Sequence, residues 1–177
     1  RMLFRLADWA HPASILEIGT SVGISTMYLA SGALGAKTIS LEGCPETAQV
    51  ARLNLEMLGL ERKVQVITGD FQETLPQALR ELGQPDLVFI DGNHRRQATL
   101  AYFETCLAQA YEYTVFVFDD MHGTPEMAAA WEQIQAHPRV TMTVDFFDLS
   151  LAFINSDFKE KQHFKIVPSR WKFWKIL

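Results

Sequence analysis

Short apolar runs alternate with longer amphipathic segments along most of this chain. The runs have the length of β-strands, and each of the first five is followed by apolar residues at helical spacing. Pro45 and Pro125 stand at helix starts, and Pro76 is expected in the first turn of its helix, where proline is tolerated. We predict strands at residues 15–18, 37–42, 64–67, 86–90 and 115–118, and helices at 2–10, 22–31, 45–58, 74–82, 95–110 and 124–136.

The last part of the chain breaks this alternation. Two further strands are predicted at residues 140–146 and 151–155, and too few residues separate them for a helical crossover, so they should pair antiparallel. Five strand–helix units followed by a hairpin are typical of an α/β, doubly wound (Rossmann-like) fold. We therefore predict a mostly parallel sheet with one antiparallel strand and helices on both faces.

Composition narrows the class of protein. The 177 residues predict a single domain over 1–177, and 48% hydrophobic with 21% charged residues is typical of soluble proteins. No apolar run approaches the ~18 residues of a membrane span. Cys44 and Cys106 have no metal-ligand spacing and are expected as reduced thiols in a cytoplasmic protein. Because the chain begins at Arg1 rather than Met, the lack of a signal peptide within it says little.

Charge is distributed unevenly. Residues 159–177 carry six Lys and Arg against one Glu and include Trp171, Phe173 and Trp174, whereas the other residues carry 10 basic and 20 acidic side chains. An acidic body argues against nucleic-acid binding. The basic, aromatic tail suits packing on its own domain, a membrane surface or a second subunit, and a homodimer through the tail or the C-terminal hairpin is one expectation.

The first strand runs into its helix through a glycine turn, which reads Glu17-Ile18-Gly19-Thr20-Ser21-Val22-Gly23-Ile24-Ser25. Glycines at this place let the backbone approach a ligand at the carboxyl end of the strand, where open α/β sheets bind small molecules. The alternative is an ordinary strand–helix turn in which glycine only supplies a positive φ.

Polar residues also follow the other strands, and the carboxyl ends of parallel strands share one rim of a sheet, so a site is predicted there. Glu42 can accept both hydroxyls of a ribose, or else cap the following helix. A dinucleotide site needs a third glycine, which this turn lacks, and Glu17 disfavours phosphate but suits a cation. S-adenosylmethionine, with an adenosine, an amino-acid end, a sulfonium and no phosphate, therefore fits better than NAD.

Together these residues resemble the class I S-adenosylmethionine-dependent methyltransferases in the O-methyltransferase, catechol-type branch. The match covers about residues 14–155: Glu17–Ser25 resembles motif I, Glu42 the ribose-binding acid, Gly69-Asp70-Phe71 the adenine loop, and Asp91–His94 and Asp119-Asp120 the motifs after the fourth and fifth strands. The resemblance implies a seven-stranded sheet of order 3-2-1-4-5-7-6 with strand 7 antiparallel. It also implies O-methylation of a small-molecule acceptor.

Carried over by position, the resemblance implies a set of cofactor contacts. Glu17 would hold the amino end of the cofactor, Ser25 its carboxylate, and Asp70 or Phe71 would lie beside the adenine. The whole implied set is Glu17, Gly19, Thr20, Ser21, Gly23, Ser25, Glu42, Gly43, Gly69, Asp70, Phe71 and Asp91.

The resemblance also implies a metal and a base. Where the catechol-type branch holds a divalent ion, this chain has Asp91, Asp119 and Asp120, whose oxygens suit Mg²⁺ or Ca²⁺ but could equally cap turns. His94 replaces the lysine general base, and an imidazole is a plausible acceptor for a hydroxyl proton, so His94 and Asp91 are the expected catalytic residues. A surface histidine is the alternative. His122 is a second candidate base, with the same alternative.

Two departures limit the match. Tyr111–Thr114 replaces a glycine pair before the fifth strand, and the segment that would cover the substrate pocket is expected to be largely missing from the N-terminal end of this sequence, so the acceptor cannot be read. The rival interpretations are a non-catalytic cofactor-binding or interaction protein, a dinucleotide oxidoreductase, and a metal-dependent relative such as the cephalosporin-hydroxylase-like proteins.

Overall fold

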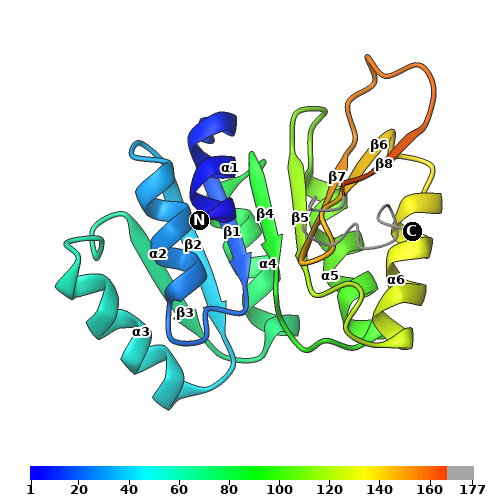
Figure 1. The fold of residues 1–177 in the computed structure, drawn as a ribbon. Coiled ribbons are helices and arrows are strands. Elements are labelled where there is room, and N and C mark those ends of the chain that lie inside the picture. The colour runs from blue at the N-terminus through cyan, green and yellow to red at the C-terminus, as the bar shows by residue number, and fades with distance from the viewer. Residues whose placement is uncertain (167–177) are drawn as a thin grey trace, which may run out of the picture.

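One eight-stranded sheet runs through the protein, with helices on both of its faces (Figure 1). The computed structural model describes residues 1–166. The sheet has the order β3-β2-β1-β4-β5-β7-β6-β8. Its strands are β1 (Ser14–Ile18), β2 (Lys37–Glu42), β3 (Val64–Thr68), β4 (Leu87–Ile90), β5 (Val115–Asp119), β6 (Met142–Asp145), β7 (Leu149–Phe153) and β8 (Gln162–Lys165). The helices are α1 (Met2–Ala10), α2 (Ile24–Gly32), α3 (Pro45–Met57), α4 (Phe71–Leu82), α5 (Arg96–Gln109) and α6 (Pro125–Ala136).

The predicted strand order 3-2-1-4-5-7-6 is confirmed, and β7 is antiparallel to both β5 and β6. The predicted number of seven strands is wrong, because β8 adds an eighth that pairs parallel with β6 at the sheet edge. All four residues of β8 are exposed, so it lacks the apolar pattern that reveals a strand. The aromatic tail at Trp171, Phe173 and Trp174 lies outside the described residues, and its predicted contacts stay predictions.

Several predicted boundaries are wrong by two or three residues, and two of them lie next to the site. The seventh strand begins at Leu149, two residues before the predicted start. Helix α4 begins at Phe71 because the Asp70 carboxylate accepts a hydrogen bond from the Gln72 N–H at 2.7 Å, which caps the helix three residues earlier than expected. Pro76 consequently lies inside the helix and not in its first turn.

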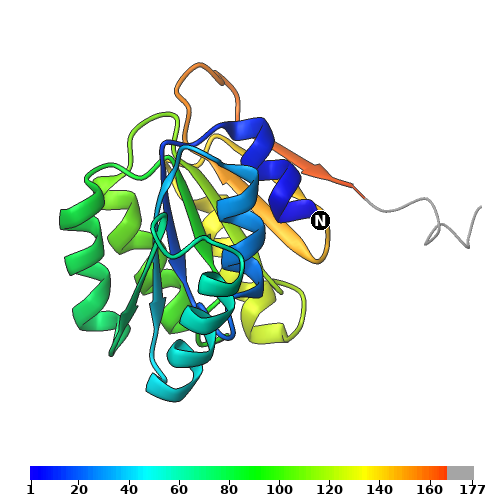
Figure 2. The same ribbon diagram turned by 90° about the vertical axis from the view of Figure 1, so that its left-hand side faces the viewer.

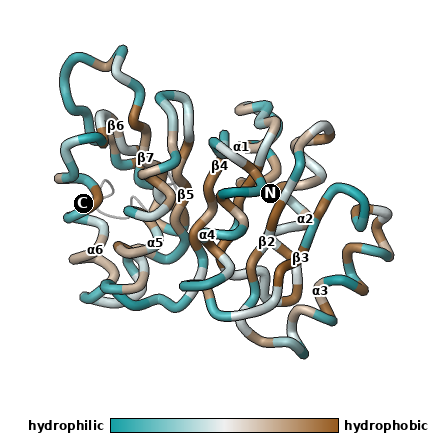
Figure 3. The backbone as a smooth tube through the Cα atoms, turned by 180° about the vertical axis from the view of Figure 1, so that it is seen from behind, coloured by the Kyte–Doolittle hydropathy of each residue, from teal (hydrophilic) through white to brown (hydrophobic). Residues whose placement is uncertain are grey.

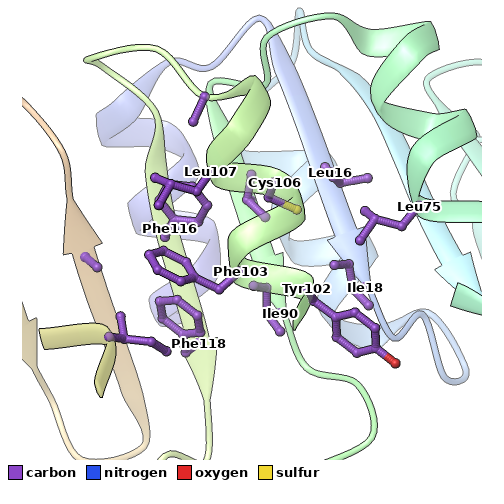
Figure 4. Close-up of a cluster of buried hydrophobic side chains, with 14 of the residues drawn as sticks. Leu16, Ile18, Leu75, Ile90, Tyr102, Phe103, Cys106, Leu107, Phe116 and Phe118 are labelled. Carbon is purple, nitrogen blue, oxygen red and sulfur yellow. The ribbon is translucent and has the colours of Figure 1, made fainter. Parts of the chain in front are cut away.

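The core has two layers, one on each side of the sheet. Helices α4, α5 and α6 cover one face, where Phe103 of α5 packs edge-on against Phe116 at 5.1 Å between ring centroids (Figure 4). Helices α1, α2 and α3 lie on the other face, where Leu29 is fully buried (Figure 2). The apolar colouring of β4 and β5 between these layers agrees with burial on both faces (Figure 3). No helix in residues 1–166 is long and apolar enough to cross a membrane.

Strand register places the site. Ile18 of β1 pairs with Ile90 of β4, and Ile90 pairs with Phe118 of β5, so these three strands end at the same level. The residues that follow them, among them Gly19, Asp91 and Asp119, must therefore meet along one rim, as predicted.

Candidate active site

A cleft of about 460 Å³ opens at this rim. One side is formed by Met2 of α1 and by the glycine turn with the first residues of α2. The opposite side carries three carboxylates, from Asp91, Asp119 and Asp148. The cleft is thus acidic on one side and built on the carboxyl ends of β1, β4 and β5.

Both glycines of the turn have positive φ, +102° at Gly19 and +87° at Gly23. A side chain on Gly19 would overlap the backbone carbonyl of Asp91, and one on Gly23 would meet Ala51 of α3 at 3.4 Å. The turn therefore needs glycine for its backbone conformation and for close packing of neighbouring segments. Contact of these glycines with a cofactor stays a prediction.

Glu17 is fully buried at the end of β1. Its carboxylate accepts hydrogen bonds from the hydroxyls of Ser25 and Ser40, each at 2.6 Å, and of Thr26. Within residues 1–166 no cationic side chain forms an ion pair with it. Burial raises the pKa of Glu17 above its ordinary value, and the three hydroxyl hydrogen bonds oppose that shift. The site thus holds a buried carboxyl group without a cationic partner among the residues that the structure describes.

Glu42 lies at the end of the neighbouring strand and points to the glycine turn. Its carboxylate accepts the Ser21 N–H at 2.7 Å and the Cys44 N–H at 2.9 Å. Each carboxylate oxygen has a second lone pair, so two further donors can be accepted. Glu42 thereby joins the residue before α3 to the turn that begins α2. It does not cap α3, because it accepts the N–H of Cys44 and not one from the first turn of the helix, and its remaining lone pairs are available to a ligand.

The remaining predicted cofactor residues lie in the loops after β2 and β3. Gly43 is exposed with open space around it. The Asp70 carboxylate caps α4, as described above, whereas the Phe71 ring packs edge-on to Tyr102 at 5.7 Å and lies against Gly92. Gly69 has a φ of +151° and donates its N–H to Glu42 O at 2.9 Å. Phe71 is therefore better placed than Asp70 to face a planar ring.

The Asp91 and Asp119 carboxyl groups are hydrogen-bonded to each other. Burial first, and then the charge of Asp119, raise the pKa of Asp91 to about 7. Burial and the charge of Asp120 raise the pKa of Asp119 as well. Each of these carboxyl groups therefore keeps its proton to a higher pH than an isolated aspartate, and a bound cation would relieve the same repulsion.

The third predicted metal ligand does not join this pair. Asp120 has a φ of +51°, and its carboxylate lies over Gly123 of the following turn. Within residues 1–166, no three His, Cys, Asp or Glu side chains are grouped so that they could hold a metal ion. Two carboxylates with waters and a substrate oxygen are nevertheless a common set of Mg²⁺ ligands, so Asp91 and Asp119 fit such an ion in part.

His94 lies beside the acid pair, with its Nε2 at 3.5 Å from Asp91 Oδ1 and half of its side chain exposed. It is held there by a left-handed backbone, with φ +70° at Asn93 and +31° at His94. His122 is engaged elsewhere: its Nε2 lies 2.8 Å from Asp145 Oδ2, and its ring stacks on Phe147. His94 is thus the histidine placed to serve the cleft.

Several residues of the site escaped the sequence analysis. Ser40 and Thr26 surround Glu17, and Asp148 supplies the third carboxylate of the cleft. Ser40 left a weak signal, since it interrupts an apolar strand and pairs with Glu17 in the register of β1 and β2. Asp148 left none, because the β6–β7 turn reaches the rim only through antiparallel pairing in space.

Comparisons with known proteins identify the family of this chain. Residues 16–121 match a family model described as a methyltransferase domain. The chain is 36% identical over 122 residues to a catechol O-methyltransferase of Mycobacterium tuberculosis, covering 68% of this chain and 54% of that protein. It is 33% identical over 123 residues to one of Niastella koreensis, covering 68% and 55%. The chain therefore spans about half the length of these relatives.

A solved structure extends the likeness beyond sequence. The O-methyltransferase of Bacillus cereus in complex with SAH matches with a TM-score of 0.73 and 29% identity, over 87% of this chain and 79% of that one. The family match covers the glycine turn, Glu42 and both acids of the pair. We conclude that this chain belongs to the methyltransferase-domain family, in the catechol O-methyltransferase-type branch of the class I S-adenosylmethionine-dependent methyltransferases.

Proposed function

We propose that the protein transfers the sulfonium methyl group of S-adenosylmethionine to a hydroxyl oxygen of a small molecule. The observation that carries this proposal is the pair of carboxylates at the ends of β1 and β2. Within residues 1–166 the buried Glu17 carboxyl group has hydroxyl partners only, and Glu42 accepts the Ser21 N–H of the glycine turn with further lone pairs available. An ammonium group suits the first, and the two hydroxyls of a ribose suit the second.

The same electrostatics disfavour a dinucleotide. A pyrophosphate would bring negative charge next to Glu17 and the acidic side of the cleft at Asp91 and Asp119. S-adenosylmethionine brings a sulfonium and an ammonium instead, and both are attracted. In this proposal the cofactor is bound by Glu17, Gly19, Thr20, Ser21, Gly23, Ser25, Glu42, Gly43, Gly69, Asp70, Phe71 and Asp91.

The transfer is an in-line displacement, so the protein acts mainly by orientation, which is worth up to ~7–11 kcal/mol in well-aligned reactions. His94 accepts the proton that leaves the acceptor hydroxyl, and Asp91 at 3.5 Å orients the imidazole. A divalent ion such as Mg²⁺, held by Asp91 and Asp119, would make that hydroxyl more acidic. The names of the relatives favour catechols as acceptors.

Titration calorimetry tests the cofactor. We expect S-adenosylmethionine and S-adenosylhomocysteine to bind, and Glu42→Ala to weaken both by at least about tenfold, as expected for a lost hydrogen bond to a charged acceptor. Glu46→Ala is the matched control, because Glu46 is an exposed acid four residues away on α3. Binding of NAD without S-adenosylmethionine, or equal affinities in both variants, would contradict the proposal.

Three further features remain proposals. We expect a cytoplasmic protein without nucleic-acid partners, since the body of the chain is acidic. A homodimer through the β6–β7 hairpin or the aromatic tail is also proposed. Size-exclusion chromatography with light scattering checks the dimer.

A further inference from the structure

An apolar groove of about 630 Å³ lies on the face of the sheet that carries α1. Its floor is made by alternate residues of β7, Leu149, Leu151 and Phe153, and continues onto β6. Leu6 and Trp9 of α1 form its wall, and Figure 2 shows α1 beside these strands. Trp9 leaves 67% of its surface exposed at the edge of this groove.

The groove is continuous with the catalytic cleft. Arg1, Met2 and Leu149 line both spaces. Leu149 pairs with Asp119 in the register of β5 and β7, so one end of the groove starts beside the acid pair. From there the floor follows β7 to Phe153, a distance of roughly 13 Å at the usual rise of a strand.

The chemistry of the lining changes along this path. The cleft end carries Asp91 and Asp119. The groove has Arg1 and Arg5 among its lining residues, but its floor and the wall at Leu6 and Trp9 are aliphatic and aromatic. A ligand that fills both spaces must therefore be polar at one end and apolar along the rest. The groove's volume is in the range of small-molecule sites.

We infer that this groove binds the apolar part of the methyl acceptor. The acceptor is then an amphipathic molecule, with its hydroxyl-bearing head at Asp91 and Asp119 and a hydrocarbon chain along β7. This inference rests on the proposed function and names its substrate class. A second copy of the chain is the less suitable occupant, because a stable dimer buries about 20–30 residues on each side and this groove involves one helix and two strands.

Affinities of a homologous series of probes test the inference. Calorimetry of the full chain, saturated with S-adenosylhomocysteine, compares 4-methylcatechol, 4-butylcatechol and 4-hexylcatechol. Each added methylene should tighten binding roughly fourfold, in line with the transfer of hydrocarbon from water. Failure of S-adenosylhomocysteine to bind overturns the proposed function and this inference together, whereas a flat series in a chain that binds it overturns the groove alone.

Substitutions locate the effect. Trp9→Glu should reduce the affinity for 4-hexylcatechol at least tenfold and flatten the series, and Val144→Lys on the groove floor should do the same. Met57→Glu on α3 is the control, because Met57 is 83% exposed and far from the groove lining, and it should keep the slope. Light scattering on the same samples detects a second copy: a dimer that Trp9→Glu converts to a monomer, with the slope unchanged, overturns the inference.

Discussion

Replacing Glu17 by glutamine should act in opposite directions on folding and on cofactor binding. The Glu17 carboxyl group is fully buried, and its partners in the described part of the chain are the hydroxyls of Ser25, Thr26 and Ser40. Burial raises its pKa above 4.5, so above that pH the folded chain holds a proton that the unfolded chain has lost. Stability therefore falls as the pH rises from 4.5 towards the folded-state pKa.

Glu17→Gln removes this loss. Its amide is never charged, and the surrounding hydroxyls can accept from its NH₂ as well as donate to its oxygen. At pH 7 the free variant should be at least as stable as the wild type. Cofactor binding should weaken, because the cofactor ammonium loses a hydrogen bond to a charged acceptor, which contributes ~1.5–3 kcal/mol to the binding free energy. This corresponds to roughly a 10- to 150-fold weaker affinity for S-adenosylmethionine.

Two measurements on the same samples decide the matter. Urea unfolding at pH 5 and pH 7 without ligand gives the free energy of unfolding, and calorimetry gives the dissociation constant. Glu56→Gln is the control, an exposed acid on α3 whose loss should change neither quantity. A variant that binds S-adenosylmethionine as tightly as the wild type refutes the ammonium assignment. Strong destabilisation at pH 7 refutes the account of the buried carboxyl group.

Three other substitutions probe the rest of the site. Gly19→Ala should lower the free energy of unfolding in urea by about 2–5 kcal/mol, because alanine is strained at a positive φ and its side chain overlaps the Asp91 carbonyl. Gly43→Ala is the control: Gly43 has open space around it, and the change should stay within ~0.5 kcal/mol. Equal losses in the two variants would contradict this account. With a chelator present, the free energy of unfolding of the wild type should fall between about pH 3.8 and 7, because burial and Asp119 raise the pKa of Asp91 to about 7. Asp91→Asn should flatten this profile in pH-dependent melts, and an unchanged profile argues against the raised pKa of Asp91. His94→Ala should lower kcat at least about 100-fold without changing the affinity for S-adenosylhomocysteine, and an unaltered kcat in a methyl-transfer assay removes His94 as the base.

The architecture was predictable because it depends on local periodicity. Strands such as β4 and β5 are apolar throughout, which is the pattern of strands covered on both faces. The edge strand β8 was missed because its four exposed residues carry no such pattern. The start of α4 was missed because Asp70, interpreted as a ligand residue, also caps the helix through Gln72.

The site was predictable in part for the same reason. Residues that follow strand ends had to share a rim, so the positions of Glu17, Glu42 and Asp91 followed from the order of the elements. Their partners did not follow. Ser40 meets Glu17 through the pairing of β1 with β2, and Asp120 leaves the acid pair because its backbone turns left-handed towards Gly123.

The sequence alone determined the α/β class, the strand–helix alternation and the list of polar residues at the rim, since all of these depend on residues that are close together in the chain. Only the tertiary structure decided which carboxyl groups have a raised pKa, which one lies buried without a cationic partner in residues 1–166, and that an apolar groove joins the cleft at Leu149. These properties depend on distances between segments remote in the chain and on the water excluded between them. Burial and proximity arise from the register of the sheet, which no single segment encodes.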